Sequence, residues 1–151
     1  MHLDELIPVY YSELIDDNDS LRSGLFDVVR KSCSHAGRYM PETIRTAIGK
    51  DHLHDWIVSS LEIFQENGIF VKIAAAHHGE SRTLVFGPVT HLEIHGAISV
   101  KANSYPMGTD DILGIGQILD IWTEYNKGMT YYILLNDNRY IRIVVRAQKK
   151  K

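Results

Sequence analysis

The chain has 151 residues, a formal charge of −3 at neutral pH, 44% hydrophobic residues and 23% charged residues. This composition predicts a single folded domain over residues 1–151, argues against long disorder, and gives no bulk attraction to nucleic acid or to anionic membranes. The one cysteine, Cys33, excludes an intramolecular disulfide, and neither a secretory leader nor an apolar run of the ~20 residues that span a bilayer is recognisable. We therefore expect a cytoplasmic protein that does not bind membranes.

Helical spacing of apolar residues dominates the stretch 1–68. Pro8 suits the first turn of a helix, and Asp17–Ser20 both breaks that helix and offers an N-cap for the next one. Pro41 opens a short third helix, and Asn67–Gly68 is a suitable end for a fourth. The expected helices are 8–15, 20–35, 41–49 and 51–66.

After this helical part, alternation of apolar and polar residues indicates strands. The expected strands are 69–76, 82–86 and 89–101, forming a three-stranded antiparallel meander, and 130–135 and 139–146, forming a final hairpin. Between the two groups we expect an irregular segment and then a helix at about 110–127, whose apolar stripe includes Ile115, Ile118 and Trp122. The predicted fold is α+β: a helical amino-terminal half packed on an antiparallel sheet of about five strands within 69–148, with one inserted helix.

The strand predicted at 89–101 carries the strongest chemical pattern. Its apolar residues share one parity, so His91, Glu93 and His95 must share the other face, with neighbours about 7 Å apart. Two imidazoles and a carboxylate can bind zinc or non-haem iron, and His77 or His78 could add a ligand or carry a proton. A metal-bound water would then be the nucleophile, or dioxygen the oxidant. The alternative is a solvated sheet face with no metal.

Charge is unevenly distributed along the chain. Residues 1–20 contain six acids and no Lys or Arg, whereas residues 138–151 contain six bases and no acid. We interpret the basic end as a solvated strand with a lysine tail that protects a sheet edge, so nucleic-acid binding is not expected. The acidic end and the irregular segment at 101–110 are candidates for binding a protein. The candidate partner-binding residues are Asp16, Asp17, Asp19, Tyr105 and Met107.

Two functional hypotheses follow from these patterns. The leading one is a small protein-binding module that needs no cofactor, with an inhibitor or immunity-type protein that masks a basic partner site as one concrete form. The other is a metal-dependent enzyme of hydrolase or oxygenase type, with zinc or iron held by His91, Glu93 and His95. The sequence leaves the partner, the substrate and the oligomeric state open.

Overall fold

The computed structural model describes residues 3–12, 15–50, 53–96 and 115–146. The helical elements come first: η1 (Leu3–Glu5), α1 (Ile7–Tyr11), α2 (Asp19–Ala36), η3 (Gly37–Tyr39) and α3 (Glu42–Lys50). The strands of the described residues follow: β1 (Ile57–Gln65), β2 (Ile69–His77), β3 (Glu80–Phe86), β4 (Val89–His95), β5 (Gly116–Tyr125), β6 (Gly128–Leu135) and β7 (Arg139–Arg146). The predicted α+β class is therefore confirmed. No described helix is long and apolar enough to cross a membrane.

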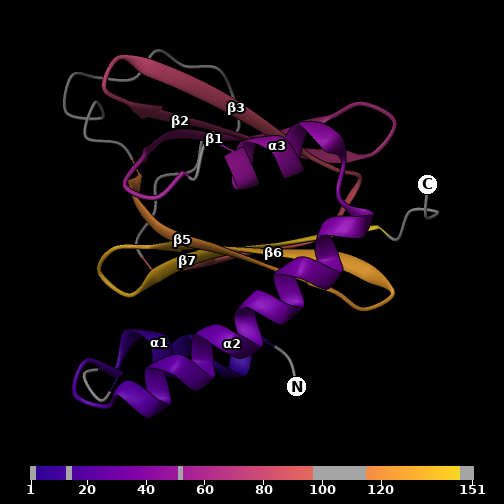
Figure 1. The fold of residues 1–151 in the computed structure, drawn as a ribbon. Coiled ribbons are helices and arrows are strands. Elements are labelled where there is room, and N and C mark those ends of the chain that lie inside the picture. Colours follow the sequence, from indigo (N-terminus) through magenta and orange to yellow (C-terminus); the bar gives the residue numbers. More distant parts are fainter. Residues whose placement is uncertain (1–2, 13–14, 51–52, 97–114, 147–151) are drawn as a thin grey trace.

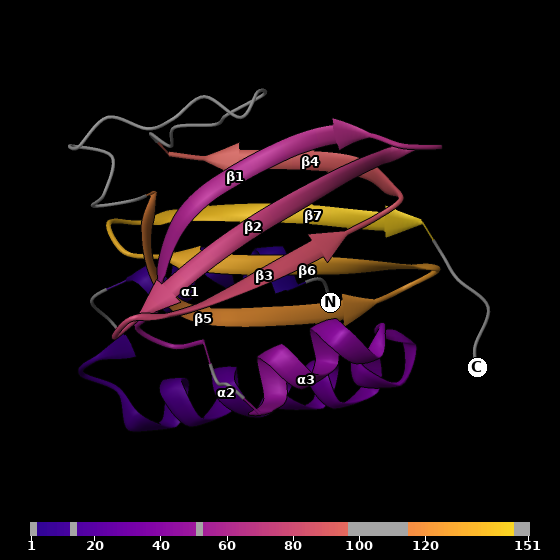
Figure 2. The same cartoon turned by 90° about the horizontal axis from the view of Figure 1, so that it is seen from above.

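The strands form one antiparallel sheet in the order β3-β2-β1-β5-β6-β7-β4. β1 and β5 are paired only where Ile57 faces Gln117 and Val58 faces Gly116. The sheet bends at this junction, so that a first layer (β1, β2 and β3) lies over a second layer (β5, β6, β7 and β4), as Figures 1 and 2 show.

The main core lies between these two layers. Phe86 of β3 and Tyr131 of β6 meet across it, with ring centroids 4.7 Å apart. Ile44 and Ala47 of α3 pack on the same core from the side where β3 and β5 lie (Figure 2). Full burial of a large apolar side chain such as that of Ile44 stabilises the fold by about 1.5–3 kcal/mol. Other buried members include Val58, Leu61, Val71, Ile73, Leu84, Ile118, Ile133, Ile141 and Ile143.

A helical layer (η1, α1 and α2) covers the opposite face of the second layer (Figure 1). The Asn18 side chain caps α2 by accepting a hydrogen bond from the backbone N–H of Leu21 at 3.0 Å. Ser12 ends α1, because its backbone N–H and its hydroxyl both donate to the carbonyl of Val9. The buried residues of this second core are Leu3, Ile7, Ile15, Leu25, Val29, Trp122, Tyr132 and Leu134.

The helix predicted at 51–66 is wrong over most of its length, because β1 occupies Ile57–Gln65. A β-bulge between Val58 and Ser60 shifts the alternation by one residue. Val58 and Leu61 therefore both face the core although they are three residues apart. That spacing mimics one face of a helix, which explains the error.

The helix predicted at about 110–127 is corrected for the same reason. Residues 110–114 of the predicted helix lie outside the described residues. From Gly116 the chain forms β5, and a bulge lies between Ile118 and Asp120. Ile118 faces the main core whereas Trp122 faces the helical layer, so β5 is apolar on both faces. Burial on both faces together with a bulge removes the simple alternation that identifies a strand.

The sheet also differs from the predicted arrangement of about five strands. The hairpin of β2 and β3 is confirmed, but β4 pairs with β7 instead of completing a meander with β3. The strand predicted at 89–101 ends at His95 in the described residues, and 97–101 lie outside them. The alternation in β4 correctly predicts which side chains share a face, but it carries no information about which strand lies beside them.

Candidate functional site

The outer face of the second layer is partly covered by helices and partly open. One residue from each strand forms a row across it: Trp122 of β5, Tyr132 of β6, Arg142 of β7 and Glu93 of β4. Trp122 and Tyr132 are 0% and 1% exposed beneath the helical layer. Arg142 and Glu93 keep 26% and 35% of their side chains exposed. The face therefore presents an open polar patch over β7 and β4.

The three residues of the predicted metal site lie together in this patch. Glu93 holds both imidazoles, with Oε2 at 3.1 Å from Nε2 of His91 and Oε1 at 3.3 Å from Nε2 of His95. Arg142 Nη1 also donates to Glu93 Oε2. His95 stacks on the Tyr140 ring with centroids 4.1 Å apart. Burial acts to raise the pKa of Glu93, but the hydrogen bonds and charges of Arg142, His95 and His91 together outweigh it and leave that pKa below its usual value.

This arrangement makes a metal ion compete with a guanidinium for the same carboxylate. Among the described residues, no group of three or more His, Cys, Asp or Glu side chains is arranged to hold a metal ion. His77 and His78 lie at the turn between β2 and β3, where His77 stacks on Trp56 with ring centroids 5.4 Å apart. Within the described part of the chain, no hydrogen bond or ion pair joins either histidine to Glu93. The metal site remains a prediction.

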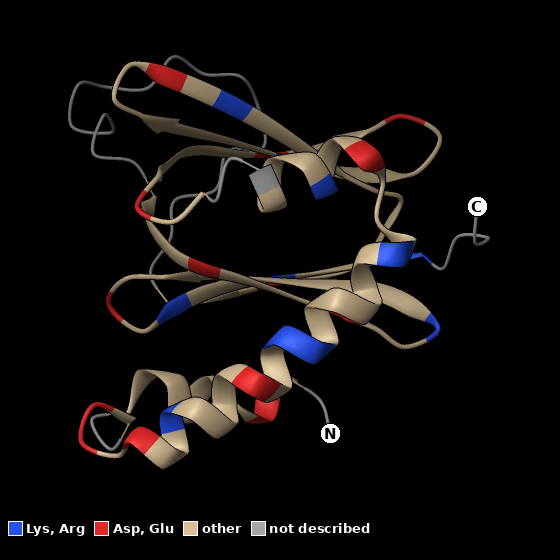
Figure 3. Ribbon diagram, in the orientation of Figure 1, with Lys and Arg blue, Asp and Glu red and all other residues tan. Residues whose placement is uncertain are grey.

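The predicted acidic residues form an exposed turn between α1 and α2. Asp16 and Asp17 lie in this turn, and Asp19 is the first residue of α2, with 96% of its side chain exposed. Arg22 organises the turn by donating to the carbonyl of Ile15 at 3.1 Å and to that of Asp16 at 2.8 Å. Figure 3 shows acidic residues gathered at this end of the helical layer. We call Asp16, Asp17 and Asp19 the acidic turn. The other candidates, Tyr105 and Met107, lie outside the described residues.

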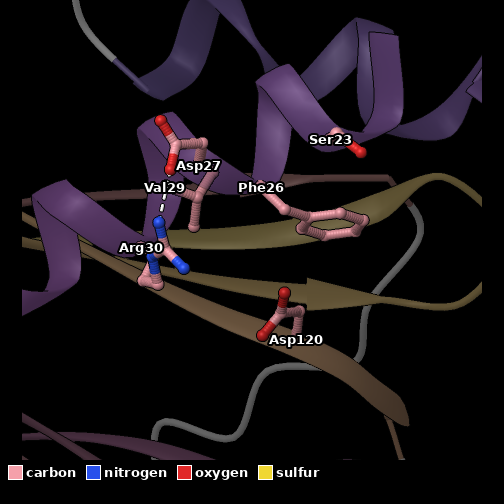
Figure 4. Close-up of a pocket in the computed structure, with 6 residues that line it drawn as sticks. All are labelled: Ser23, Phe26, Asp27, Val29, Arg30 and Asp120. Atoms are coloured by element: carbon pink, nitrogen blue, oxygen red, sulfur yellow. Dashed lines mark hydrogen bonds and ion pairs between the residues drawn. The ribbon is translucent and has the colours of Figure 1, made fainter. Parts of the chain in front are cut away.

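Two cavities lie along α2, and the ring of Phe26 lines both of them. The larger has a volume of about 570 Å³ and is lined by Ser23, Phe26, Asp27, Val29, Arg30 and Asp120 (Figure 4). The second has a volume of about 360 Å³ and is lined by Tyr10, Tyr11, Ser12, Ile15, Asp16, Arg22, Phe26 and Leu119. Phe26 is 40% exposed at their junction. We call the two cavities together the α2 groove.

Asp120 is the most unusual polar group in the groove. Its Oδ1 accepts from the backbone N–H of Ile121 and its Oδ2 accepts from Nε1 of Trp122, each at 2.9 Å. No lysine or arginine of the described chain forms an ion pair with it. Burial raises the pKa of Asp120, and the two hydrogen bonds and the nearby His54 only partly oppose this. A cavity-lining carboxyl that has a raised pKa and no ion pair with a lysine or arginine is a candidate functional group.

The other carboxyl of the larger cavity, Asp27, has a different environment. Its side chain is 44% exposed and forms ion pairs with Arg30 and Lys31, the latter at 3.1 Å. The hydrogen bond and charge of Lys31, followed by the charge of Arg30, lower the pKa of Asp27. Arg30 lines the larger cavity but is bound to Asp27, so Asp120 has no cation of its own there.

Sequence reasoning missed Asp120 because it placed this residue in a helix. The available signal was a single carboxylate inside the apolar stretch Ile118–Trp122. An acid in a segment that is apolar on both faces is unusual, because burial of an unpaired charge is costly. Once the segment is recognised as a strand, this residue stands out as a candidate site.

The stability of the fold is expected to depend on pH through Asp120. Because its pKa is raised by folding, the unfolded chain loses this proton first as the pH rises from about 4, and the folded state becomes progressively less favoured. Each unit of difference between the two pKa values corresponds to about 1.4 kcal/mol. Asp120→Asn removes this dependence, while its loss of one hydrogen bond acts equally at every pH.

The measurement is the free energy of unfolding in urea for both proteins between pH 3.5 and 7.5. We expect the wild type to lose stability relative to the variant as the pH rises. A difference that stays constant would show that folding leaves the pKa of Asp120 unchanged. A difference that changes in favour of the wild type would show that the fold stabilises the ionised carboxylate. Asp27→Asn is the matched control, because its carboxyl is exposed and already paired.

The described residues thus contain two candidate sites. One is the Glu93 carboxylate on β4 with its two imidazoles, and the other is the acidic, aromatic groove along α2. The first is fully occupied by its own partners, whereas the second has an unpaired carboxyl and an exposed ring. Comparisons with protein-family models, with curated proteins and with solved structures find no match to this chain.

Proposed function

We propose that this chain is a small protein-binding module that binds a basic surface of a partner protein through the α2 groove and the acidic turn. The observation that carries the proposal is Phe26, which is 40% exposed between cavities whose linings include Asp16 and Asp120. Aromatic side chains in a desolvated pocket supply much of the energy of protein interfaces. Carboxylates around them select a positively charged partner.

The rest of α2 supports a protein partner over a small molecule. Leu21 and Val28 are 37% and 39% exposed. They are seven residues apart and lie on the other flank of the helix from Phe26, since each residue turns the helix by about 100°. The helix therefore exposes apolar side chains on both flanks, which suits a contact area larger than the groove alone.

The acidic turn would act mainly during encounter. Its residues are exposed, so their attraction to a basic surface is long-ranged at low salt and is screened at physiological ionic strength. The aromatic groove would then provide the lasting contact. An inhibitor or immunity-type protein that covers a basic active site is one concrete form of this function.

The test compares two triple variants of equal charge change. Asp16→Asn/Asp17→Asn/Asp19→Asn removes the acidic turn, and Glu62→Gln/Glu66→Gln/Glu80→Gln removes three acids from the strands and turns of the first layer. A partner captured from extract of the source cells by the wild type is identified, and its association rate is then measured with each variant. We expect the first triple to slow association tenfold or more at low salt, and the second to have little effect.

Two results would count against the proposal. One is an equal loss of association rate in both triple variants, which would mean that only net charge matters. The other is the absence of any captured protein at every salt concentration. Circular dichroism of both variants checks that the helical layer is retained.

A further inference from the structure

We propose that the α2 groove is an arginine site, in which a guanidinium group of the partner is seated on the Asp120 carboxylate beside the Phe26 ring. This inference rests on the proposed protein-binding function and specifies the chemistry of the partner. It concerns the larger cavity of the groove, which Figure 4 shows between α2 and β5.

The first support is the hydrogen-bonding capacity of Asp120. A carboxylate offers about four acceptor positions, two on each oxygen. One position on each oxygen is used, by the backbone N–H of Ile121 and by Nε1 of Trp122. Each oxygen therefore keeps one position, and a planar guanidinium carries paired N–H donors that match two carboxylate oxygens. A lysine ammonium is a point charge and cannot form this double contact.

The second support is the charge balance of the cavity. Its lining contains the carboxylates of Asp27 and Asp120 and one cation, Arg30. Arg30 is bound to Asp27, and Lys31 neutralises Asp27 further. Asp120 is the carboxylate of this cavity that forms no ion pair with a described lysine or arginine, although His54 lies nearby. A bound guanidinium would remove the cost of ionising this half-buried group, which is a gain that a neutral ligand cannot provide.

The third support is the shape and lining of the cavity. Its volume of about 570 Å³ is ample for an arginine side chain and lies in the range typical of ligand sites. In Figure 4 the Phe26 ring and the Asp120 carboxyl both lie in the space between α2 and β5, so a guanidinium bound to the carboxylate can stack on the ring. Val29 adds an apolar surface for the methylene stem of the arginine.

Nuclear magnetic resonance of the intact chain tests the site directly. Nα-acetyl-arginine N-methylamide is titrated while the indole N–H of Trp122, which is bonded to Asp120, serves as the reporter. The indole of Trp56, which lies in the main core, is the internal reference. The corresponding citrulline derivative is a neutral molecule of the same shape. The lysine derivative carries the positive charge but lacks the paired N–H donors of a planar guanidinium.

We expect a saturable shift of the Trp122 resonance with a Kd on the order of millimolar, the range of single-residue ligands. The lysine derivative should bind several-fold more weakly, and the citrulline derivative should produce no saturable shift. Asp120→Asn should weaken binding of the arginine derivative at least tenfold. Phe26→Ala should weaken it several-fold. Because the Phe26 ring is 40% exposed but also packs edge-on against Tyr10, the Trp56 resonance and circular dichroism check that this variant keeps its fold. Val85→Ala, at an exposed apolar side chain of β3 in the first layer, should bind as the wild type does.

The assignment is overturned if the arginine derivative gives no saturable shift, if citrulline binds equally well, or if Asp120→Asn binds as the wild type does. These results are distinguishable from failure of the proposed function. Absence of arginine binding together with a partner lost only in the acidic-turn variant would remove the arginine site and leave the protein-binding function standing. If the arginine derivative binds but the acidic-turn variant associates with the partner as fast as the wild type does, the arginine site stands and the proposed function of the acidic turn is removed.

Discussion

Replacement of Trp122 by alanine is expected to lower the free energy of unfolding by about 3–5 kcal/mol. Its side chain is 0% exposed and lies in the core between β5 and the helical layer. The Tyr10 ring contacts it edge-on, with centroids 5.2 Å apart. Its Nε1 also donates to Asp120, so the substitution both opens a cavity and removes a donor from a half-buried carboxylate.

Trp122→Phe separates these two effects. Phenylalanine keeps much of the apolar contact with Tyr10 but cannot donate to Asp120, so we expect it to cost clearly less than alanine. Combining each change with Asp120→Asn gives a double-mutant cycle, and the coupling energy reports the hydrogen bond. Unfolding in urea followed by circular dichroism is the measurement. An alanine variant within 1 kcal/mol of the wild type would show that the helical layer contributes little to the stability of the sheet.

The helices were predictable because their signals are local. Asn18 caps α2 where the sequence places an N-cap, and Pro41 precedes α3. The hairpin of β2 and β3 and that of β6 and β7 were predictable for the same reason, since a turn sequence lies between two apolar runs. The pairing of β4 with β7 was not predictable, because strand partners far apart in sequence are set by the packing of the whole sheet.

The bulges explain both the wrong predictions and part of the site. In β5 the bulge between Ile118 and Asp120 leaves Leu119 out of register. The carbonyl of Leu119 accepts a hydrogen bond from Nδ1 of His54 at 2.6 Å, and its side chain lines the α2 groove. β-bulges commonly re-aim side chains beside functional sites. The irregularity that makes β5 resemble a helix in the sequence is therefore also what brings Leu119 and Asp120 to the groove.

The candidate residues differ in how far the sequence could place them. Alternation in β4 correctly predicts that His91, Glu93 and His95 share one face, since this needs only the local geometry of a strand. It could not predict Arg142, which approaches Glu93 because β7 pairs with β4. A long-range contact thus supplies the cation that changes the interpretation of the motif.

Replacement of Arg139 by methionine is the other substitution expected to have a large effect, about 2–4 kcal/mol of unfolding free energy. Its side chain is 19% exposed and donates from Nη1 to the carbonyl of Ile115 at 2.7 Å. It also donates from Nε to the carbonyl of Asn136 at 3.1 Å and from Nη2 to the side-chain oxygen of Asn136 at 2.8 Å. Hydrogen bonds that involve a charged group contribute about 1.5–3 kcal/mol each, and bonds that share one donor group do not add fully.

The position of Arg139 makes the expected effect global rather than local. The Tyr11 hydroxyl lies 2.7 Å from the carbonyl oxygens of both Leu135 and Arg139, which share its one proton. It therefore anchors α1 to the hairpin of β6 and β7, which Arg139 connects to the residue before β5. Arg139→Lys is the matched control, since lysine keeps the charge but cannot reach Ile115 and Asn136 with a planar fork. We expect lysine to recover less than half of the loss in urea unfolding. Full recovery would mean that the positive charge alone stabilises this part of the β6–β7 hairpin, and that water can replace the three hydrogen bonds from Arg139 to Ile115 and Asn136.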